Sequence, residues 1–170
     1  MDNRSKVILI AAIVGLLLVG GGVAYVYYSQ RGLRNNNPGN IMLEAGQTWQ
    51  GQLTQAQVEQ AGGTWDGTFV QFDTMTDGVR ALILTLSNYI NADGVAPDVS
   101  DIITRWSATD QDAYVADVAS ALGVAPTDTL TMNSATYIAL AQAITTQENG
   151  ANPIDISIYQ QAAAEAGVPT

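Results

Sequence analysis

The chain has 170 residues, 47% of them hydrophobic, with no cysteine, no histidine and a net charge of −10. Without imidazole or thiol groups, it can form neither a Ser-His-Asp triad nor a Cys-His dyad nor an ordinary zinc site. Any catalysis must therefore use carboxylates, hydroxyls, amides or the backbone. The expected chemistry involves no metal and no cofactor. The length fits one domain of ordinary size.

The charge is divided unevenly along the chain. Residues 1–34 carry four basic residues and one acidic residue, a net charge of +3, whereas residues 35–170 carry two basic and fifteen acidic residues, a net charge of −13. The acidic part lacks the clustered Lys and Arg that neutralise phosphates. We therefore expect no nucleic-acid partner.

Residues 7–28 form an apolar run of 22 positions without a charged residue. A helix of about 20 residues crosses the roughly 30 Å hydrocarbon layer of a bilayer, so the run predicts one transmembrane helix. The alternative is a cleaved signal peptide, because a basic start precedes the run and residues 22–24 are small. We favour the anchor because the apolar run continues beyond that site. The predicted organisation is an anchor region, 1–30, and one domain, 31–170.

The predicted elements of the domain change character near residue 75. Residues 31–75 are rich in Gly and Asn and predict loops, with one helix at 54–61 and one short strand at 68–72. Helical periodicity then predicts five segments, at 76–93, 101–106, 109–122, 133–148 and 156–165. The expected fold class is mainly α (α+β).

Glu148 is the candidate catalytic residue. Tyr137, Leu140 and Ile144 lie on one face of the fourth predicted helix, and Glu148 is the next member of that series. The carboxyl group thus continues an apolar stripe at a helix C-terminus, where the dipole disfavours negative charge. Both conditions favour a carboxylic acid that donates a proton. The alternative is a solvated side chain in a fraying last turn.

An asparagine-rich motif, RNNNPGNI, occupies residues 34–41. Asn side chains supply donors and acceptors without charge, and the Pro-Gly pair fixes a turn. Neutral amides suit hydroxyl-rich and acetamido-rich sugars, although the same residues also make ordinary surface turns. The candidate substrate-binding residues are Asn35, Asn36, Asn37 and Asn40. Three tryptophans are candidates either for stacking on sugars or for the core: Trp49, Trp65 and Trp106.

Eight short motifs extend over most of residues 31–150: RGLRNNNPGNI (31–41), WQG (49–51), FVQFD (69–73), DGVRAL (77–82), IITRW (102–106), YVADVA (114–119), LGV (122–124) and AITTQENG (143–150). Together they resemble a family of small phage and prophage virion proteins with a lysozyme-like domain, and NNNPGN is the most specific of them. The resemblance implies a peptidoglycan lytic transglycosylase or muramidase-type activity, with glycan strands as substrate and other virion proteins as partners.

Residues 143–153, AITTQENGANP, are similar to the helix end that carries the catalytic Glu of lytic transglycosylases. This similarity implies that Glu148 is the general acid and base. Asn149 takes the place of the Ser that usually follows, and we count it among the substrate-binding candidates. In those enzymes the helix comes first, whereas here it lies near the end of the chain. We therefore expect a circularly permuted lysozyme-like order.

Two mechanisms remain open at this point. In a lytic transglycosylase, the C6 hydroxyl of N-acetylmuramic acid closes a ring, so one carboxyl group suffices. An inverting hydrolase needs a second carboxylate roughly 6.5–9.5 Å away. The candidates for this second group are Glu44 and Asp73, and we favour the single-carboxylate mechanism.

Two further alternatives concern role and location. The domain is either an enzyme that acts during phage entry or a structural or wall-binding virion protein with a catalytically weak lysozyme-like domain. We expect a single-pass protein in a virion internal membrane or in a bacterial inner membrane. A third interpretation of its role is a wall-remodelling enzyme of the host, located in the bacterial inner membrane. Residues 7–28 would cross the bilayer, with residues 31–170 on the side away from the N-terminus.

Overall fold

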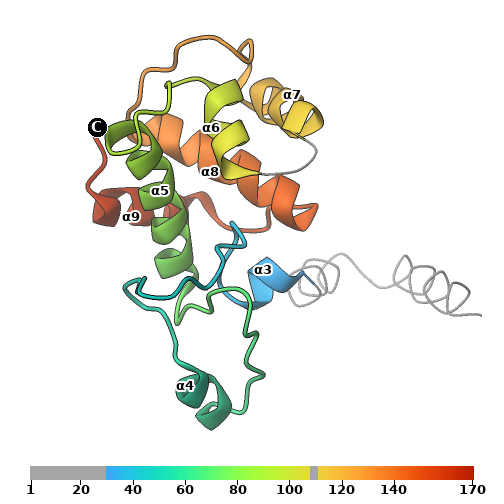
Figure 1. Ribbon diagram of the computed structural model, residues 1–170, viewed down its shortest axis with the longest axis vertical. Coiled ribbons are helices and arrows are strands. Elements are labelled where there is room, and N and C mark those ends of the chain that lie inside the picture. The colour runs from blue at the N-terminus through green and yellow to red at the C-terminus, as the bar shows by residue number, and fades with distance from the viewer. Residues whose placement is uncertain (1–29, 108–110) are drawn as a thin grey trace, which may run out of the picture.

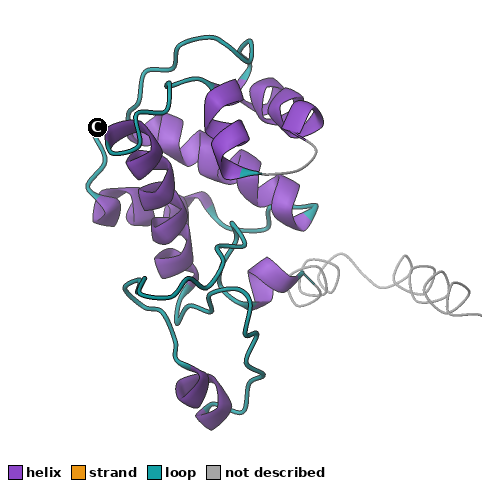
Figure 2. Cartoon of the chain, in the orientation of Figure 1, coloured by secondary structure: helices purple, strands orange, loops and turns teal. Residues whose placement is uncertain are grey.

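A computed structural model describes residues 30–107 and 111–170. Its helices in chain order are α3 (Arg31–Arg34), α4 (Gln55–Gln60), α5 (Met75–Asn91), α6 (Val99–Trp106), α7 (Gln111–Leu122), α8 (Ser134–Asn149) and α9 (Ile156–Ala166). Helices α5 to α9 pack together, whereas α4 lies at the opposite end on long loops (Figure 1). Figure 2 shows helices and loops and no strand ribbon in the described part of the chain. The mainly α class is confirmed.

Helix α8 lies at the centre of the packing. It contacts α5, α7 and α9 and also the short α3, while α5 packs extensively against α9. The apolar face predicted for α8 is buried, as is the face of α5. The largest buried side chains of this core come from four helices: Leu82, Ile83, Leu86, Ile102, Ile103, Tyr137, Leu140, Ile144 and Tyr159. The C-terminal end of α8, which carries Glu148, is thus held by packing against several helices.

The helix termini follow the capping rules. Thr54 and Gln57 form the capping box of α4, and the Asn133 side chain accepts a hydrogen bond from the Thr136 backbone N–H at the start of α8. Gly150 ends α8 with a φ of 71°, in the left-handed region that favours glycine. Helix α5 begins slightly earlier than predicted, because the Thr74 hydroxyl accepts from the Asp77 N–H.

The predicted strand at 68–72 is wrong. Val70 and Phe72 are buried, as the alternation indicates, but within the described residues the segment makes only isolated bridges, Met42 with Phe69 and Gln52 with Phe72. Its backbone groups form hydrogen bonds with separate loop segments. The N–H of Val70 donates to the carbonyl of Ile41, and the N–H of Phe72 donates to the carbonyl of Asn35. No single neighbouring segment runs alongside it, so no ladder forms.

The predicted membrane anchor, residues 7–28, lies outside the described residues. Within residues 30–107 and 111–170, no helix has the length and apolar character needed to cross a bilayer.

Candidate active site

Glu148 lies in the last turn of α8, where its half-buried carboxyl group is held by three hydrogen-bond donors. Oε1 accepts from the Trp106 indole Nε1 at 3.1 Å and from the Tyr114 hydroxyl at 3.0 Å. Oε2 accepts from Asn40 Nδ2 at 3.0 Å. These donors come from α6, α7 and the asparagine-rich loop, so three separate parts of the chain fix one carboxyl group. The alternative of a fully solvated side chain in a frayed turn does not describe this geometry.

Tyr114 is a permanent donor in this arrangement. Burial strongly raises the pKa of its hydroxyl, and the adjacent carboxyl group of Glu148 raises it further. The phenol therefore stays protonated throughout the physiological pH range and donates to Glu148.

A groove of about 540 Å³ opens beside Glu148. Neutral amides line it together with aromatic rings: Asn40, Gln47, Asn88, Trp49, Phe69, Tyr89 and Trp106. The charged groups of the lining are the carboxyl groups of Glu44, Asp93 and Glu148 and the guanidinium of Arg105. The rings of Tyr89 and Trp106 meet edge to face with centroids 6.5 Å apart. Amides that donate and accept, combined with flat apolar rings, suit a ligand with both hydroxyl groups and apolar ring faces.

The asparagine-rich motif divides into structural and groove-facing residues. Asn37 is fully buried; its Nδ2 donates to the carbonyls of Ile41 and Val70, and its Oδ1 accepts from the Ile41 N–H. Asn35 is buried and donates to Asp66, while Asn36 donates to the carbonyls of two residues at 72–73. In this structure these amides hold the loop, and their predicted role in substrate binding stays a prediction. Of the four asparagines in the motif, only Asn40 lines the groove.

Backbone conformation explains two of these asparagines. Asn36 and Asn40 have φ angles of 51° and 49°, the only positive values among the non-glycine residues that the structure describes. Asn tolerates this left-handed conformation better than most residues because its short side chain bonds locally. The turn thus brings the Asn40 amide to Glu148 while Asn36 holds the loop against the segment that precedes α5.

Asn149 is also structural. It is 2% exposed, and its Nδ2 donates to the carbonyls of Pro38 and Thr145, which joins the loop to α8. Its amide therefore bonds within the protein, and its predicted contact with substrate stays a prediction. Its Oδ1 and the Oδ1 of Asn40 both approach Gly32, where an added Cβ would lie 2.6 and 2.8 Å from them. A side chain at residue 32 would displace both amides.

The structure separates the two candidates for a second carboxylate. Glu44 lines the groove, whereas Asp73 is exposed and does not belong to its lining. The tryptophans separate too: Trp49 and Trp106 line the groove and Trp65 does not. Glu44 therefore stays the candidate for the second carboxylate that an inverting mechanism would need.

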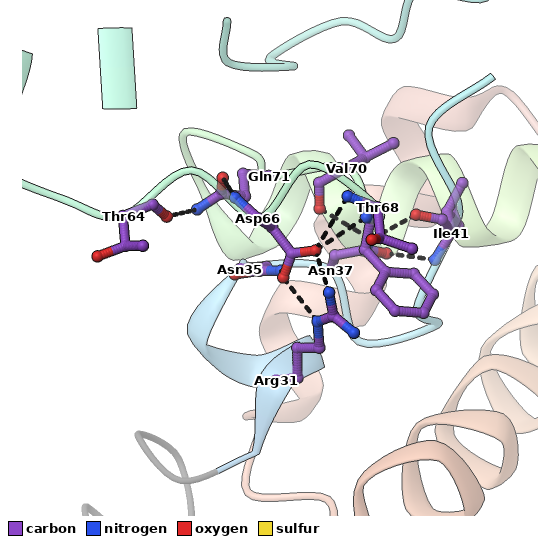
Figure 3. Close-up of polar contacts among 10 residues, drawn as sticks. Arg31, Asn35, Asn37, Ile41, Thr64, Asp66, Thr68, Val70 and Gln71 are labelled. Atoms are coloured by element: carbon purple, nitrogen blue, oxygen red, sulfur yellow. Dashed lines mark hydrogen bonds and ion pairs between the residues drawn. The ribbon is translucent and has the colours of Figure 1, made fainter. Parts of the chain in front are cut away.

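A second polar cluster, centred on Asp66, holds the asparagine-rich loop in place (Figure 3). Asp66 accepts two hydrogen bonds from the Arg31 guanidinium, at 2.5 and 2.7 Å, and one from Asn35 Nδ2 at 2.8 Å. It also accepts from the backbone N–H groups of Thr68 and Phe69. The hydrogen bonds from Arg31 hold the pKa of the Asp66 carboxyl well below its usual value of 3.8. The cluster joins α3 to the loop that precedes α5.

The protein should lose stability in acid as the carboxyl group of Asp66 becomes protonated. Because its folded-state pKa is depressed, its contribution is present above its unfolded pKa and is lost as pH falls below about 3.8. We expect Asp66→Asn to lower the free energy of unfolding at pH 7 by about 1–3 kcal/mol, since several donors lose a charged acceptor. Thermal melts between pH 2.5 and 7 should show a shallower acid loss for this variant, while the exposed Asp73→Asn should follow the wild type. Parallel curves for Asp66→Asn and the wild type would contradict the assignment.

Sequence reasoning does not identify the two aromatic partners of Glu148. Tyr114 occurs there only as part of the YVADVA motif, and Trp106 only as a candidate for sugar stacking or for the core. The available signal is chemical, because a half-buried Tyr or Trp brings a polar group that needs a partner. The sequence does not specify that both partners are the same carboxyl group.

The fold and site define a small helical domain with a carboxyl group held beside an amide-lined and aromatic-lined groove. No protein-family model matches the chain. Over 128 residues the chain is 34% identical to Protein P5 of Pseudoalteromonas phage PM2, a match that covers 72% of this chain and 73% of that protein. The chain belongs to the family of this bacteriophage protein. The phage part of the resemblance is thereby confirmed.

Proposed function

We propose that the protein is a peptidoglycan lytic transglycosylase that cleaves the bond between N-acetylmuramic acid and N-acetylglucosamine, with Glu148 as general acid and base. The observation that supports this proposal is the Glu148 carboxyl group, which lines the groove and is oriented by Asn40, Trp106 and Tyr114. Positioned carboxyl groups of this kind perform proton transfer in glycoside cleavage.

The hydrogen bonds distinguish the two carboxyl oxygens. Oε1 accepts two hydrogen bonds, which use both of its lone pairs, whereas Oε2 accepts one from Asn40. Oε2 therefore carries the transferable proton. It protonates the glycosidic oxygen as the C1–O bond breaks, and the resulting carboxylate then takes the proton from the C6 hydroxyl as that oxygen bonds to C1. One carboxyl group completes both steps.

The proposed setting combines this chemistry with the anchor. Residues 7–28 would span a virion internal membrane or a bacterial inner membrane, and the domain would act on glycan strands on the far side during phage entry, beside other virion proteins. We also propose a circularly permuted lysozyme-like arrangement, in which the helix that carries the acid follows the loop and the other helices in the chain. The match to a phage protein supports the viral setting over a host wall-remodelling enzyme.

The test is the product formed from purified sacculi by the full chain in detergent. Mass spectrometry should find anhydromuramic ends, and Glu44→Gln should release them at a rate within about twofold of the wild type, because ring closure needs no second carboxylate. Reducing ends together with loss of activity in Glu44→Gln would instead support an inverting hydrolase. Sacculi that are bound but not cleaved would overturn the enzyme and support the wall-binding virion protein.

A further inference from the structure

Arg105 is the only basic residue among the described residues that line the groove. It lies in the last turn of α6, next to Trp106, and its side chain is 54% exposed. The guanidinium lies over the Tyr89 ring, 4.7 Å from the centroid, and donates to Asp93 Oδ2 at 3.2 Å. Stacking and the ion pair hold the cation at the groove while leaving it accessible.

The other arginines of the domain do not line the groove. Arg31 pairs with Asp66, and the buried Arg80 donates to the carbonyl of Gln50. Arg34 is exposed on α3 and does not belong to the groove lining. Since residues 35–170 carry a net charge of −13, most of the domain surface repels anions. Within the groove, Arg105 is the single cation that the described residues supply, beside the carboxyl groups of Glu44, Asp93 and Glu148, and its guanidinium keeps donors beyond the one used by Asp93.

The chemistry of the ligand that we have proposed identifies this group. The acetamido sugars of a glycan strand are neutral when the lactyl group is joined to a peptide, so the anions of intact peptidoglycan are the carboxylates of its stem peptides. A guanidinium has five N–H donors in a planar fork that matches a carboxylate, and the hydrogen bond to Asp93 uses a donor of one terminal nitrogen. Sugar recognition by the amides and rings does not need this charge.

We propose that Arg105 binds a stem-peptide carboxylate and so directs cleavage to peptide-bearing muramic acid. This inference rests on the proposed function and adds a specificity determinant to it. Trp106 links Arg105 to the proton donor, because its indole donates to Glu148 and Arg105 is the preceding residue of the same helix. The carboxylate site and the proton donor are thus connected through adjacent residues of one helix.

The experiment compares native sacculi with sacculi whose carboxylates have been converted to methylamides by a carbodiimide and methylamine. We expect the full-length wild type to release muropeptides about tenfold more slowly from the amidated sacculi, as loss of a charge-assisted hydrogen bond predicts. Arg105→Gln should be about tenfold slower on native sacculi and indifferent to amidation. Arg105→Lys should recover part of the difference, and Arg34→Gln, with the same change in charge outside the groove, should behave as the wild type.

Equal responses of Arg105→Gln and the wild type to amidation would overturn the inference. A separate measurement does not need cleavage: the Glu148→Gln protein should bind native sacculi more tightly than amidated sacculi, and adding Arg105→Gln should abolish this preference. Absence of cleavage by the wild type would reject the proposed function, while the binding preference alone would still decide whether Arg105 recognises a carboxylate. If the protein with Arg105→Gln still binds native sacculi more tightly than amidated sacculi, another residue recognises the stem-peptide carboxylate.

Discussion

Glu148→Gln is expected to reduce the release of muropeptides from sacculi by roughly 10²- to 10⁴-fold, the range that positioned acid-base groups contribute. The amide has nearly the shape of the carboxyl group but no proton acidic enough to transfer. Its oxygen can still accept from Trp106 and Tyr114. The Asn40 Oδ1, which has no hydrogen-bond partner among the described residues, can accept from the introduced amide after rotation of the Asn40 side chain. We therefore expect the variant to fold.

The matched control for this variant is Glu165→Gln. Glu165 is exposed on α9 and its substitution changes the net charge by the same amount. Muropeptide release by Glu165→Gln should equal that of the wild type, and thermal melts of all three proteins should agree within a few degrees. A Glu148→Gln protein that is folded and fully active would move the proton donor to another residue.

Gly78→Ala is expected to destabilise the domain, although it adds only one methyl group. Gly78 is buried in α5, where an added Cβ would fall on the backbone carbonyl oxygen of Asn36 and 3.2 Å from the Phe72 ring. Overpacking costs about 1–3 kcal/mol, whereas Ala gains at most about 1 kcal/mol over Gly in a helix. We expect the cost of overpacking to exceed the gain in helix propensity, because hydrogen bonds from the Asn36 side chain to the carbonyls of Phe72 and Asp73 hold Asn36 in place.

The measurement for Gly78→Ala is chemical and thermal unfolding. We expect a loss of about 2 kcal/mol and a melting temperature lower by roughly 4–8 °C. Asn91→Ala, at the exposed end of the same helix, should change stability by no more than about 0.5 kcal/mol. Because the loop that Gly78 contacts also carries Asn40, muropeptide release should fall in the Gly78 variant. An unchanged melting temperature would show that the loop does not need this close approach.

Local rules predicted much of the fold. The helices α4, α8 and α9 begin at or within one residue of their predicted starts, and the apolar spacing of α5 and α8 predicted their buried faces. The same spacing placed Glu148 at the end of a buried stripe. The strand at 68–72 failed because a strand requires a continuous partner, and alternation within one segment carries no information about its neighbours.

The site depended on contacts that local patterns cannot show. The asparagine-rich motif predicted a set of ligand-binding amides, but burial and bonding assign Asn35, Asn37 and Asn149 to the protein's own architecture and leave Asn40 at the groove. Glu44 and Asp73 were equivalent candidates in the sequence, and only Glu44 lines the groove.

The sequence by itself determined the absence of imidazole and thiol chemistry, the helical class and the position of one carboxyl group on an apolar face, because these follow from composition and from periodicity within single segments. The tertiary structure alone decided which groups surround that carboxyl. Asn40, Trp106 and Tyr114 are 108, 42 and 34 residues away from Glu148 along the chain. Helix packing brings them together, and hydrogen bonding depends on distances in space that spacing in the sequence does not encode.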